Sequence, residues 1–407
     1  MKKGFILIFG LSFLGLIGLS LAANPAGKTN PVEKAVPGKK SVPSGKSLPA
    51  EKSSQEEQST PVEGTVAPVK SQSGDSQRQG AFKTSLHHTG RGMAFWYGKE
   101  NNGLELLTDR AYSQLACKKC HVASCEGCHP PAAKTKAPSA KPDPVPSETC
   151  LKCHDQLAAH LKLTRGTPRE DVHLAKGMQC LDCHTSKEMH GNDQEYQSQK
   201  QPGALEARCE KCHEDISDSR AHRKHWKKVE CQACHAGSMM NQTSTQFETL
   251  AKEGRRVSLP VTDWVFLMNR NQKLAAANLQ AFVLPEGKTF LMFTPSHSHT
   301  IVKSVRKCGD CHGSAVMSQA EKGPINLSWL EEGKVKTLKG LIPVVAGATY
   351  NLVYQSYQNG KWSLLEKPAA PKIQYAGYGG PVTDTQWRKM LKFKSEDSGI
   401  QKNKKKK

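Results

Sequence analysis

The chain has 407 residues, and its 58 Lys and Arg residues outnumber its 37 Asp and Glu residues, which gives a formal net charge of +21. A basic excess of this size favours acidic partners. It does not predict nucleic-acid binding here, because no recognition motif and no stripe of basic and aromatic residues accompanies it.

The N-terminus has the pattern of an export signal. Lys2 and Lys3 precede an apolar run from Phe5 to Ala23, and small residues end this run before Asn24. We expect residues 1–23 to direct the chain out of the cytoplasm and then to be removed. The run is close to the roughly 20 residues that span a bilayer, so an uncleaved membrane anchor is the alternative. In both cases the remaining chain is predicted to be periplasmic or extracellular.

Residues 24–80 are rich in Pro, Lys, Ser, Gln and Glu and contain few large apolar residues. Such a segment buries too little apolar surface to offset the entropy lost on ordering, so a disordered linker is predicted. The aromatic cluster Phe95-Trp96-Tyr97 marks the start of ordered structure.

All fourteen cysteines of the chain lie in seven Cys-x-x-Cys-His motifs, which we number 1 to 7 in chain order. The cysteines are Cys117, Cys120, Cys125, Cys128, Cys150, Cys153, Cys180, Cys183, Cys209, Cys212, Cys231, Cys234, Cys308 and Cys311. The histidines that end the motifs are His121, His129, His154, His184, His213, His235 and His312. This pattern is the attachment signature of c-type haem, in which the thiols bind the vinyl groups and the imidazole binds the iron.

Zinc ribbons, thioredoxin-like redox centres and disulfide frameworks also use paired cysteines, but none of them requires a histidine directly after the second cysteine. With 16 His in 407 residues, seven such histidines arise by chance with a probability of roughly 10⁻¹⁰. The sequence therefore predicts seven covalently attached haem c groups, each with its iron.

Six of the motifs lie within residues 117–235, which leaves about 20 residues for each haem, too few to cover six porphyrins with an ordinary core. We therefore expect the haems to form the core, with short helices and loops around them. The predicted fold class is mostly α and irregular, with a six-haem cytochrome c domain at residues 81–244. A proline-rich stretch, residues 130–147, is predicted to be an exposed loop.

Residues 245–407 are predicted to form a mixed, partly β region that carries the seventh haem. Strand-like runs cover residues 261–268, 281–284 and 289–293, and Asn359-Gly360 and Glu332-Gly333 predict two hairpins. Residues 383–392 are predicted to form a capped helix. The lysine-rich end, Lys402 to Lys407, is expected to be a solvated tail or a contact for an anionic surface.

Nine histidines lie outside the motifs and are candidates for the second axial position of the irons. Seven ligands result if the doublets His87-His88 and His297-Ser298-His299 each supply one. The predicted second ligands are His88, His160, His173, His190, His222, His225 and His299. Adjacent histidines could instead bind two neighbouring haems, and any of the candidates could bond a propionate or face solvent.

Two of these candidates, His160 and His190, each lie six residues after a motif histidine. The intervening chain is too short to reach the far side of the same haem, so we expect both to bind a neighbouring haem. Methionine is the competing ligand and would raise the reduction potential. The methionines near the motifs are Met178, Met189, Met239, Met240 and Met317. Because histidines suffice, bis-histidine ligation is predicted, and no catalytic residue is predicted.

The motif-bearing part of the chain, residues 85–312, resembles the multihaem cytochromes c of the octahaem tetrathionate reductase and hydroxylamine oxidoreductase superfamily. Three segments carry the resemblance, namely residues 117–129, 171–184 and 225–235. It implies a role in anaerobic respiration. Tetrathionate reductases mark their catalytic haem with lysine in place of the motif histidine, whereas all seven motifs here end in histidine. Hydroxylamine oxidoreductases need an eighth haem and a tyrosine cross-link.

Two functions remain open. The first is an electron carrier that passes electrons through bis-histidine haems to a terminal acceptor, with a quinol dehydrogenase or other cytochromes as redox partners. The alternative is a reductase of a sulfur or nitrogen oxyanion or of a metalloid, which needs one haem without a second ligand. The paired motifs at residues 117–129 are the favoured place for such an open haem.

Overall fold

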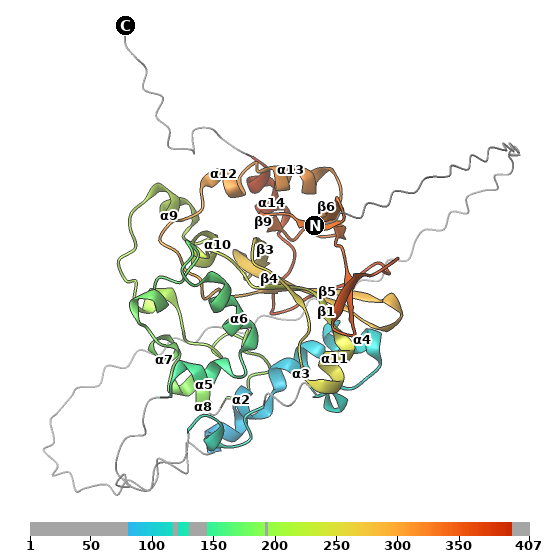
Figure 1. Ribbon diagram of the computed structural model, residues 1–407. Helices are drawn as coiled ribbons and strands as arrows, with labels where there is room; N and C mark the ends of the chain where they lie inside the picture. The colour runs from blue at the N-terminus through green and yellow to red at the C-terminus, as the bar shows by residue number, and fades with distance from the viewer. Residues whose placement is uncertain (1–79, 117–120, 130–144, 192–193, 393–407) are drawn as a thin grey trace, which may run out of the picture. The chain divides into compact units, whose positions relative to one another are not determined.

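The computed structural model describes residues 80–116, 121–129, 145–191 and 194–392 (Figure 1). All of these residues fall within one unit of the chain, Val69–Lys407. The predicted export signal, the linker, most of the proline-rich loop, Cys117, Cys120 and the lysine-rich end lie outside the described residues.

The first half of the described chain forms short helices joined by turns. Ser85, Thr185 and Ser219 cap three of these helices, since each side-chain oxygen accepts a hydrogen bond from a backbone N–H of the first turn. The α-helices are α2 (Leu86–Thr89), α3 (Arg91–Tyr97), α4 (Glu105–Thr108), α5 (Ser147–Leu151), α6 (Asp155–Thr164), α7 (Cys180–Cys183), α8 (Ser186–His190), α9 (Arg220–His225) and α10 (Cys231–His235). The 3-10 helices are η1 (Lys99–Asn101), η2 (Tyr112–Gln114), η4 (Cys125–Gly127), η5 (Leu174–Lys176) and η6 (Cys209–Lys211).

The second half contains all of the strands that the described residues form. The strands are β1 (Asn241–Gln246), β2 (Leu259–Val261), β3 (Trp264–Arg270), β4 (Lys273–Val283), β5 (Thr289–Pro295), β6 (Ile325–Asn326), β7 (Ser328–Glu331), β8 (Lys334–Thr337), β9 (Gly340–Pro343), β10 (Tyr350–Asn351), β11 (Gln355–Gln358), β12 (Lys361–Leu364) and β13 (Lys372–Tyr375). The helices of this half are α11 (Phe247–Glu253), η7 (Pro285–Gly287), α12 (Cys308–Cys311), α13 (Ala315–Lys322) and α14 (Asp384–Leu391).

A seven-stranded sheet organises this half around its longest strand, β4. One edge of β4 pairs antiparallel with β5, from Ala277 opposite Pro295 to Val283 opposite Thr289. On the other edge, β3 pairs antiparallel with the first residues of β4, and β1 pairs parallel with its last residues. Strands β13, β9 and β2 complete the sheet by pairing with β5, β3 and β1.

Both faces of β3 are buried, because successive side chains of a strand point to opposite sides. Trp264, Phe266 and Met268 are 0% exposed and belong to one apolar cluster with residues of β4, β5 and the C-terminal strands. Val265 and Leu267 belong to a second cluster, which includes residues of α10, α13 and α14. The second cluster therefore packs α10, which carries motif 6, and α13, which follows motif 7, against the sheet.

A third apolar cluster attaches the N-terminal helices to the sheet. Tyr97 at the end of α3 and Leu115 beyond η2 pack with Phe247 of α11, Phe282 of β4 and Phe290 of β5. The Tyr97 hydroxyl is 2.7 Å from Thr108 Oγ1 and donates to the Arg110 carbonyl at 2.9 Å. The chain that leads into motif 1 is thus held by ordinary side-chain packing.

The predicted fold class, mostly α and irregular with a haem core, is wrong. Of the interpretable residues, 35% are helical and 23% are in strands that form several sheets, so the fold is mixed α/β. The physical reason is that the apolar runs after residue 240 pair with one another and build a core from their own side chains. The hairpins at Asn359-Gly360 and Glu332-Gly333 and the capped helix at residues 384–391 are confirmed.

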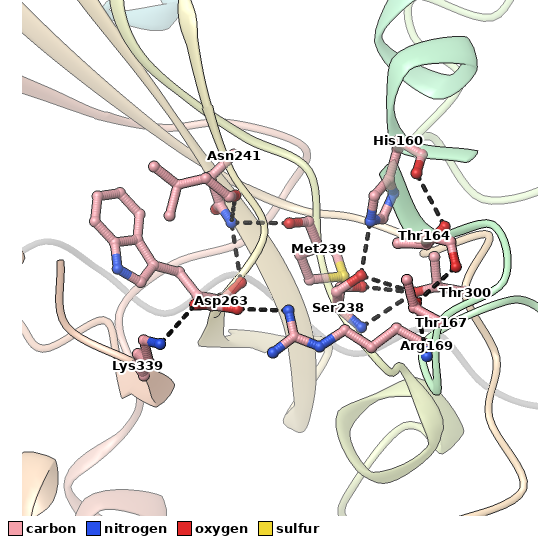
Figure 2. A network of polar contacts seen from close by, with 12 residues as sticks. His160, Thr164, Thr167, Arg169, Ser238, Met239, Asn241, Asp263, Thr300 and Lys339 are labelled. Carbon is pink, nitrogen blue, oxygen red and sulfur yellow. Dashed lines mark hydrogen bonds and ion pairs between the residues drawn. The ribbon is translucent and has the colours of Figure 1, made fainter. Parts of the chain in front are cut away.

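Asn241 is a buried polar residue whose side chain forms hydrogen bonds from β1 to β2, β3 and β4 (Figure 2). Its side-chain N–H groups donate to the carbonyls of Met239, Val261 and Trp264, and its carbonyl accepts from the N–H of Leu279 at 2.9 Å. Truncation would leave several buried backbone groups without partners. We expect Asn241→Ala to lower the free energy of unfolding by about 3 kcal/mol, measured by urea denaturation followed by circular dichroism.

A second asparagine provides the matched control for this substitution. Asn278 is half-buried, and its side chain donates to the Met240 carbonyl at 3.3 Å. We expect Asn278→Ala to cost about 1 kcal/mol or less. Equal losses for the two variants would contradict the importance assigned to the Asn241 network.

Candidate haem sites

Each motif whose cysteines the structure describes forms one helical turn. The turn brings the two cysteines to the same side, because residues three apart are neighbours on a helix. In five of these motifs the backbone N–H of the histidine donates to the carbonyl of the first cysteine, for example His129 to Cys125 at 2.8 Å and His312 to Cys308 at 2.8 Å. The sixth, motif 6, lies within α10 (Cys231–His235). The shared geometry presents two thiols and one imidazole from a single turn.

Six of the motif histidines each face one histidine from outside the motifs. The distances between ring centroids are 6.4 Å for His87 and His154, 6.0 Å for His129 and His190, 6.1 Å for His173 and His213, 6.2 Å for His184 and His299, 6.3 Å for His222 and His235, and 6.1 Å for His225 and His312. The six distances span a narrow range, within the roughly 4.5–7 Å at which aromatic rings pair directly. All six pairs join a motif histidine to a non-motif histidine.

The Nδ1 atoms of several paired histidines are bonded to backbone carbonyls. His222 donates to the Ser217 carbonyl at 2.8 Å, and His225 donates to the Ala221 carbonyl at 2.9 Å. His312 donates to the Lys389 carbonyl at 2.8 Å. A carbonyl only accepts hydrogen bonds, so the proton of each ring is on Nδ1 and the lone pair is on Nε2. Each ring therefore presents the lone pair of Nε2, which is the arrangement in which a histidine can bind a metal.

At motif 4 a carboxylate takes the place of the carbonyl. His184 Nδ1 lies 2.7 Å from Glu188 Oε2, and the Glu188 side chain is 1% exposed. The other carboxylate oxygen of Glu188 accepts from the backbone N–H groups of Glu206 and Ala207. Glu188 therefore holds the His184 ring and also fixes the chain that leads into motif 5.

Burial favours the neutral form of four paired histidines, His87, His154, His235 and His299, and the neutral form is the one that binds a metal. Burial lowers the pKa of His299 to about 4, and the neighbouring His184 ring lowers it further. Burial and then the His222 ring lower the pKa of His235.

The thiols of motifs 2, 3 and 4 lie next to one another. Burial raises the pKa of Cys128 of motif 2, and the Cys153 thiol of motif 3 raises it further. Burial also raises the pKa of Cys150 of motif 3, followed by the charge of Cys180 in motif 4 and a hydrogen bond with that thiol. Motif 3 thus lies between motifs 2 and 4, because Cys150 interacts with the thiols of both Cys128 and Cys180.

Similar contacts between thiols connect motif 4 to motif 5 and motif 5 to motif 6. Burial and then the Cys212 thiol of motif 5 raise the pKa of Cys183. A hydrogen bond between Cys209 of motif 5 and Cys231 of motif 6 raises the pKa of Cys209 and lowers that of Cys231 to about 7.

The thiols of motifs 6 and 7 also interact with each other. Burial raises the pKa of Cys311 to about 12, and the Cys234 thiol of motif 6 raises it further. Interactions between thiols thus connect each of motifs 2 to 6 to the motif that follows it in the sequence.

His88 and His160, both predicted as second ligands, are not in these pairs. His88 Nδ1 is bonded to the Val122 carbonyl at 3.2 Å, and the adjacent residue His87 faces His154 instead. His160 is 3% exposed, and its Nε2 is 2.8 Å from Ser238 Oγ, so the nitrogen that would bind a metal is engaged (Figure 2). The other five predicted second ligands, His173, His190, His222, His225 and His299, each face a motif histidine.

His160 predicts a pH dependence of stability. Burial, followed by His299 and Arg169, lowers its pKa from 6.5 to about 4. The unfolded chain therefore binds the proton more tightly, and the stabilisation present above pH 6.5 is lost as the pH falls toward 4. We expect this group to contribute at most about 3 kcal/mol to that loss. Urea denaturation of His160→Gln, which keeps a partner for Ser238, should lose less stability than the native chain between pH 7 and pH 5.

Equal slopes for the native chain and His160→Gln would contradict the role given to His160. The half-buried Gln156 on the same helix offers a matched substitution, Gln156→Ala, that leaves the titrating group in place. That variant is expected to keep the native pH dependence.

His297, the other member of its doublet, lies in a cationic environment. Burial lowers its pKa to about 3, and Lys200 and Arg270 lower it further. Arg270 is also paired with Glu230 at 2.7 Å.

Three of the methionines near the motifs, Met239, Met240 and Met317, lie in buried positions. Met239 and Met317 pack in the apolar cluster between the sheet and the helices.

His121 of motif 1 has a different neighbour. All sixteen histidines of the chain are described, and among the ring contacts of these residues His121 faces Tyr112, with centroids 6.4 Å apart and the Tyr112 hydroxyl 3.5 Å from Nε2. A Cβ at Gly90, where φ is +63°, would lie 1.8 Å from Nε2, so a larger residue there would be strained and would require the His121 ring to move. Burial lowers the pKa of His121, and His88 lowers it further.

No family model, no curated protein and no solved structure matched the chain. Within the described ranges, no cluster of three or more His, Cys, Asp or Glu side chains is arranged to hold a metal ion by itself. A search of the same residues found no helix with the length and apolar character needed to cross a membrane.

Proposed function

We propose that the chain is an exported multihaem cytochrome c that holds seven covalent haems and transfers electrons. The observation that carries this proposal is the set of six histidine pairs, each joining one motif histidine to one non-motif histidine. The sequence motifs were the basis of the prediction, and the pairing of their histidines is independent of the spacing of the cysteines.

The pair distances fit one metal between two imidazoles. A metal–imidazole bond is about 2 Å long, and the ring centroid lies about 1 Å behind the bonding nitrogen. Two rings on opposite sides of one metal therefore have centroids about 6 Å apart, as the six pairs do. Each pair supplies two ligands, which leaves four positions for a porphyrin.

Different residues would bind different parts of the cofactor. The paired cysteines of each motif would form the thioether bonds, and the six histidine pairs would supply the axial ligands, with His87 in the role predicted for His88. The Nδ1 contacts hold the rings in the protonation state that the axial position needs. When bound, haem supplies reversible one-electron chemistry, and two histidine ligands favour low potentials. The thiol contacts support an ordered path from motif 2 to motif 7.

The direct test is to express the full-length chain with a cytochrome c maturation system and to quantify covalent haem. We expect seven haems per chain by pyridine haemochrome and a matching mass increase in the denatured protein. The ferric protein should show at least six low-spin haems by electron paramagnetic resonance. A chain purified without covalent haem from a host that loads another multihaem cytochrome would overturn the proposal.

A second candidate function, reduction of a small oxyanion, is favoured by one observation, namely that the ring paired with His121 is Tyr112 and not a histidine. If no histidine completed this site, a haem at motif 1 would have one protein ligand. Electron paramagnetic resonance of the oxidised protein with and without nitrite or sulfite tests this candidate. A high-spin signal from one haem that shifts on ligand addition would support it, and seven unresponsive low-spin haems would exclude it.

The location of the protein and its redox partners are part of the same proposal. Residues 1–23 would direct export, and the mature chain would act in the periplasm or outside the cell, as in anaerobic respiration. The redox partners would be a quinol dehydrogenase or other cytochromes. Membership of the superfamily named above rests on the motif-bearing segments alone.

A further inference from the structure

Three helices meet at the last motif. His225 at the end of α9 faces His312 at the end of α12, with ring centroids 6.1 Å apart. The carbonyls of Lys389 and Met390 in α14 accept hydrogen bonds from His312 Nδ1 and from the Gly313 N–H, each at 2.8 Å. These contacts bring α9, α12 and α14 together around motif 7, which is the end of the path defined by the thiol contacts (Figure 1).

The segments that meet there are strongly basic. Residues 218–228 contain five Lys or Arg residues and one Asp. Residues 303–310 and residues 384–392 each contain three Lys or Arg residues and one Asp. The lysines Lys224, Lys227, Lys228 and Lys307 are all exposed. A surface with this charge raises the association rate of an acidic protein by electrostatic steering.

The carboxylates of these segments do not cancel the charge. Asp218 is paired with Arg223 at 2.9 Å, and the Asp310 carboxylate accepts the backbone N–H of Lys307 at 2.9 Å. Glu230, just beyond the first segment, is bonded to Arg270 by two hydrogen bonds, at 2.9 and 2.7 Å. Asp218 and Asp310 are thus each bonded to a neighbour, and the three segments together carry eleven Lys or Arg residues and three Asp residues.

Two large apolar side chains are exposed among these lysines. Trp226, which directly follows His225, is 43% exposed, and Val305 is 50% exposed. Protein–protein interfaces combine an apolar centre rich in tryptophan with a polar rim. We call Lys224, Trp226, Lys227, Lys228, Val305 and Lys307 the basic face.

We propose that the basic face is a docking surface for an acidic redox protein, which exchanges electrons with the chain at motif 7. This inference rests on the proposed function, because a docking surface beside motif 7 serves electron transfer only if the motif carries a haem. The position of the face at the end of the ordered path, its charge and its exposed tryptophan together favour such a partner over an interior structural role.

The test uses reduced flavodoxin, a small acidic electron donor, and the full-length haem-loaded protein. Stopped-flow spectroscopy would measure the second-order rate of haem reduction at low and high ionic strength. We expect the native rate to fall as salt is added. Lys227→Glu/Lys228→Glu should slow the reaction about tenfold or more at low salt, and much less at high salt. Trp226→Ala should slow the reaction at both salt concentrations.

The matched control reverses two exposed lysines on hairpins that carry no motif, Lys334 of β8 and Lys361 of β12. Lys334→Glu/Lys361→Glu changes the net charge equally and is expected to retain the native rate within about twofold. Equal slowing in both double variants would overturn the proposal in favour of a general charge effect. Native rates in Lys227→Glu/Lys228→Glu would also overturn it, even if this variant had lost binding to phosphatidylglycerol vesicles, which would identify a membrane contact instead.

The haem count of each variant separates the two proposals. If the native chain carries no covalent haem, the proposed function fails before any docking is measured. If native and variant chains carry equal numbers of haems and their absorption spectra agree, a difference in flavodoxin rate reports on the basic face.

Discussion

In His299→Gly, one haem in seven is expected to become high-spin while the other six remain low-spin. His299 faces His184 of motif 4 at 6.2 Å, and its pKa is lowered to about 4 by burial, so it is placed as a neutral ligand. Removal of one axial histidine should raise the potential of that haem by on the order of 100 mV. Electron paramagnetic resonance and a redox titration would measure the two changes, and added imidazole should restore the low-spin signal.

His297 is the control for this experiment, because it lies two residues away in the same segment. Its Nε2 is 3.5 Å from Arg270, and Lys200 and Arg270 contribute to its lowered pKa. His297→Gly should leave all spin states unchanged. A high-spin haem in His297→Gly but not in His299→Gly would reverse the ligand assignment.

Removal of motif 5 is expected to divide the electron path into two parts. The thiol contacts run from Cys183 to Cys212 and from Cys209 to Cys231, so motif 5 lies between motifs 4 and 6. Cys209→Ala/Cys212→Ala should yield six haems. A ruthenium photoreductant attached at exposed Val305→Cys should then reduce the haems of motifs 6 and 7 rapidly, and the others should lag by orders of magnitude.

Removal of motif 2 through Cys125→Ala/Cys128→Ala is the matched control, because this motif lies at the start of the described contacts. This variant also loses one haem, but the haems of motifs 3 to 7 should equilibrate as fast as in the native chain. Equal rates of equilibration in the two six-haem variants would contradict the linear order.

Local sequence signals predicted the C-terminal elements well, for identifiable physical reasons. Asn359 and Gly360 have φ angles of 50° and 80°, which suit the two central positions of a tight hairpin turn, and Thr383 caps α14 as expected. The predicted fold class failed because it was inferred mainly from the number of side chains that surround each haem. Strand-like runs were predicted where β3, β4 and β5 form, but not that their side chains build a core of their own, nor that β9 joins by a long-range parallel pairing.

The candidate site was readable from the sequence only in part. The motif cysteines and histidines follow from spacing, but the choice between His87 and His88 depends on which side of a short helix faces His154, and no local pattern fixes that. The spacing argument for His160 could not include its contact with Ser238, because that contact is a tertiary one. Glu188, four residues after His184, has the spacing of a helical neighbour, and this signal could have identified it as a partner of the ring.

The pairing of distant histidines has a consequence for the order of events during secretion. His299 lies far downstream of His184, and His312 lies far downstream of His225, so one member of each pair emerges long before the other if the chain is threaded across the membrane from its N-terminus. His87, by contrast, is already outside when His154 arrives. A haem attached to motif 4 would therefore wait with one vacant axial position until the C-terminal half had crossed. The strand-rich half of the chain would in this way set when the motif 4 site is completed, because His299 lies in that half.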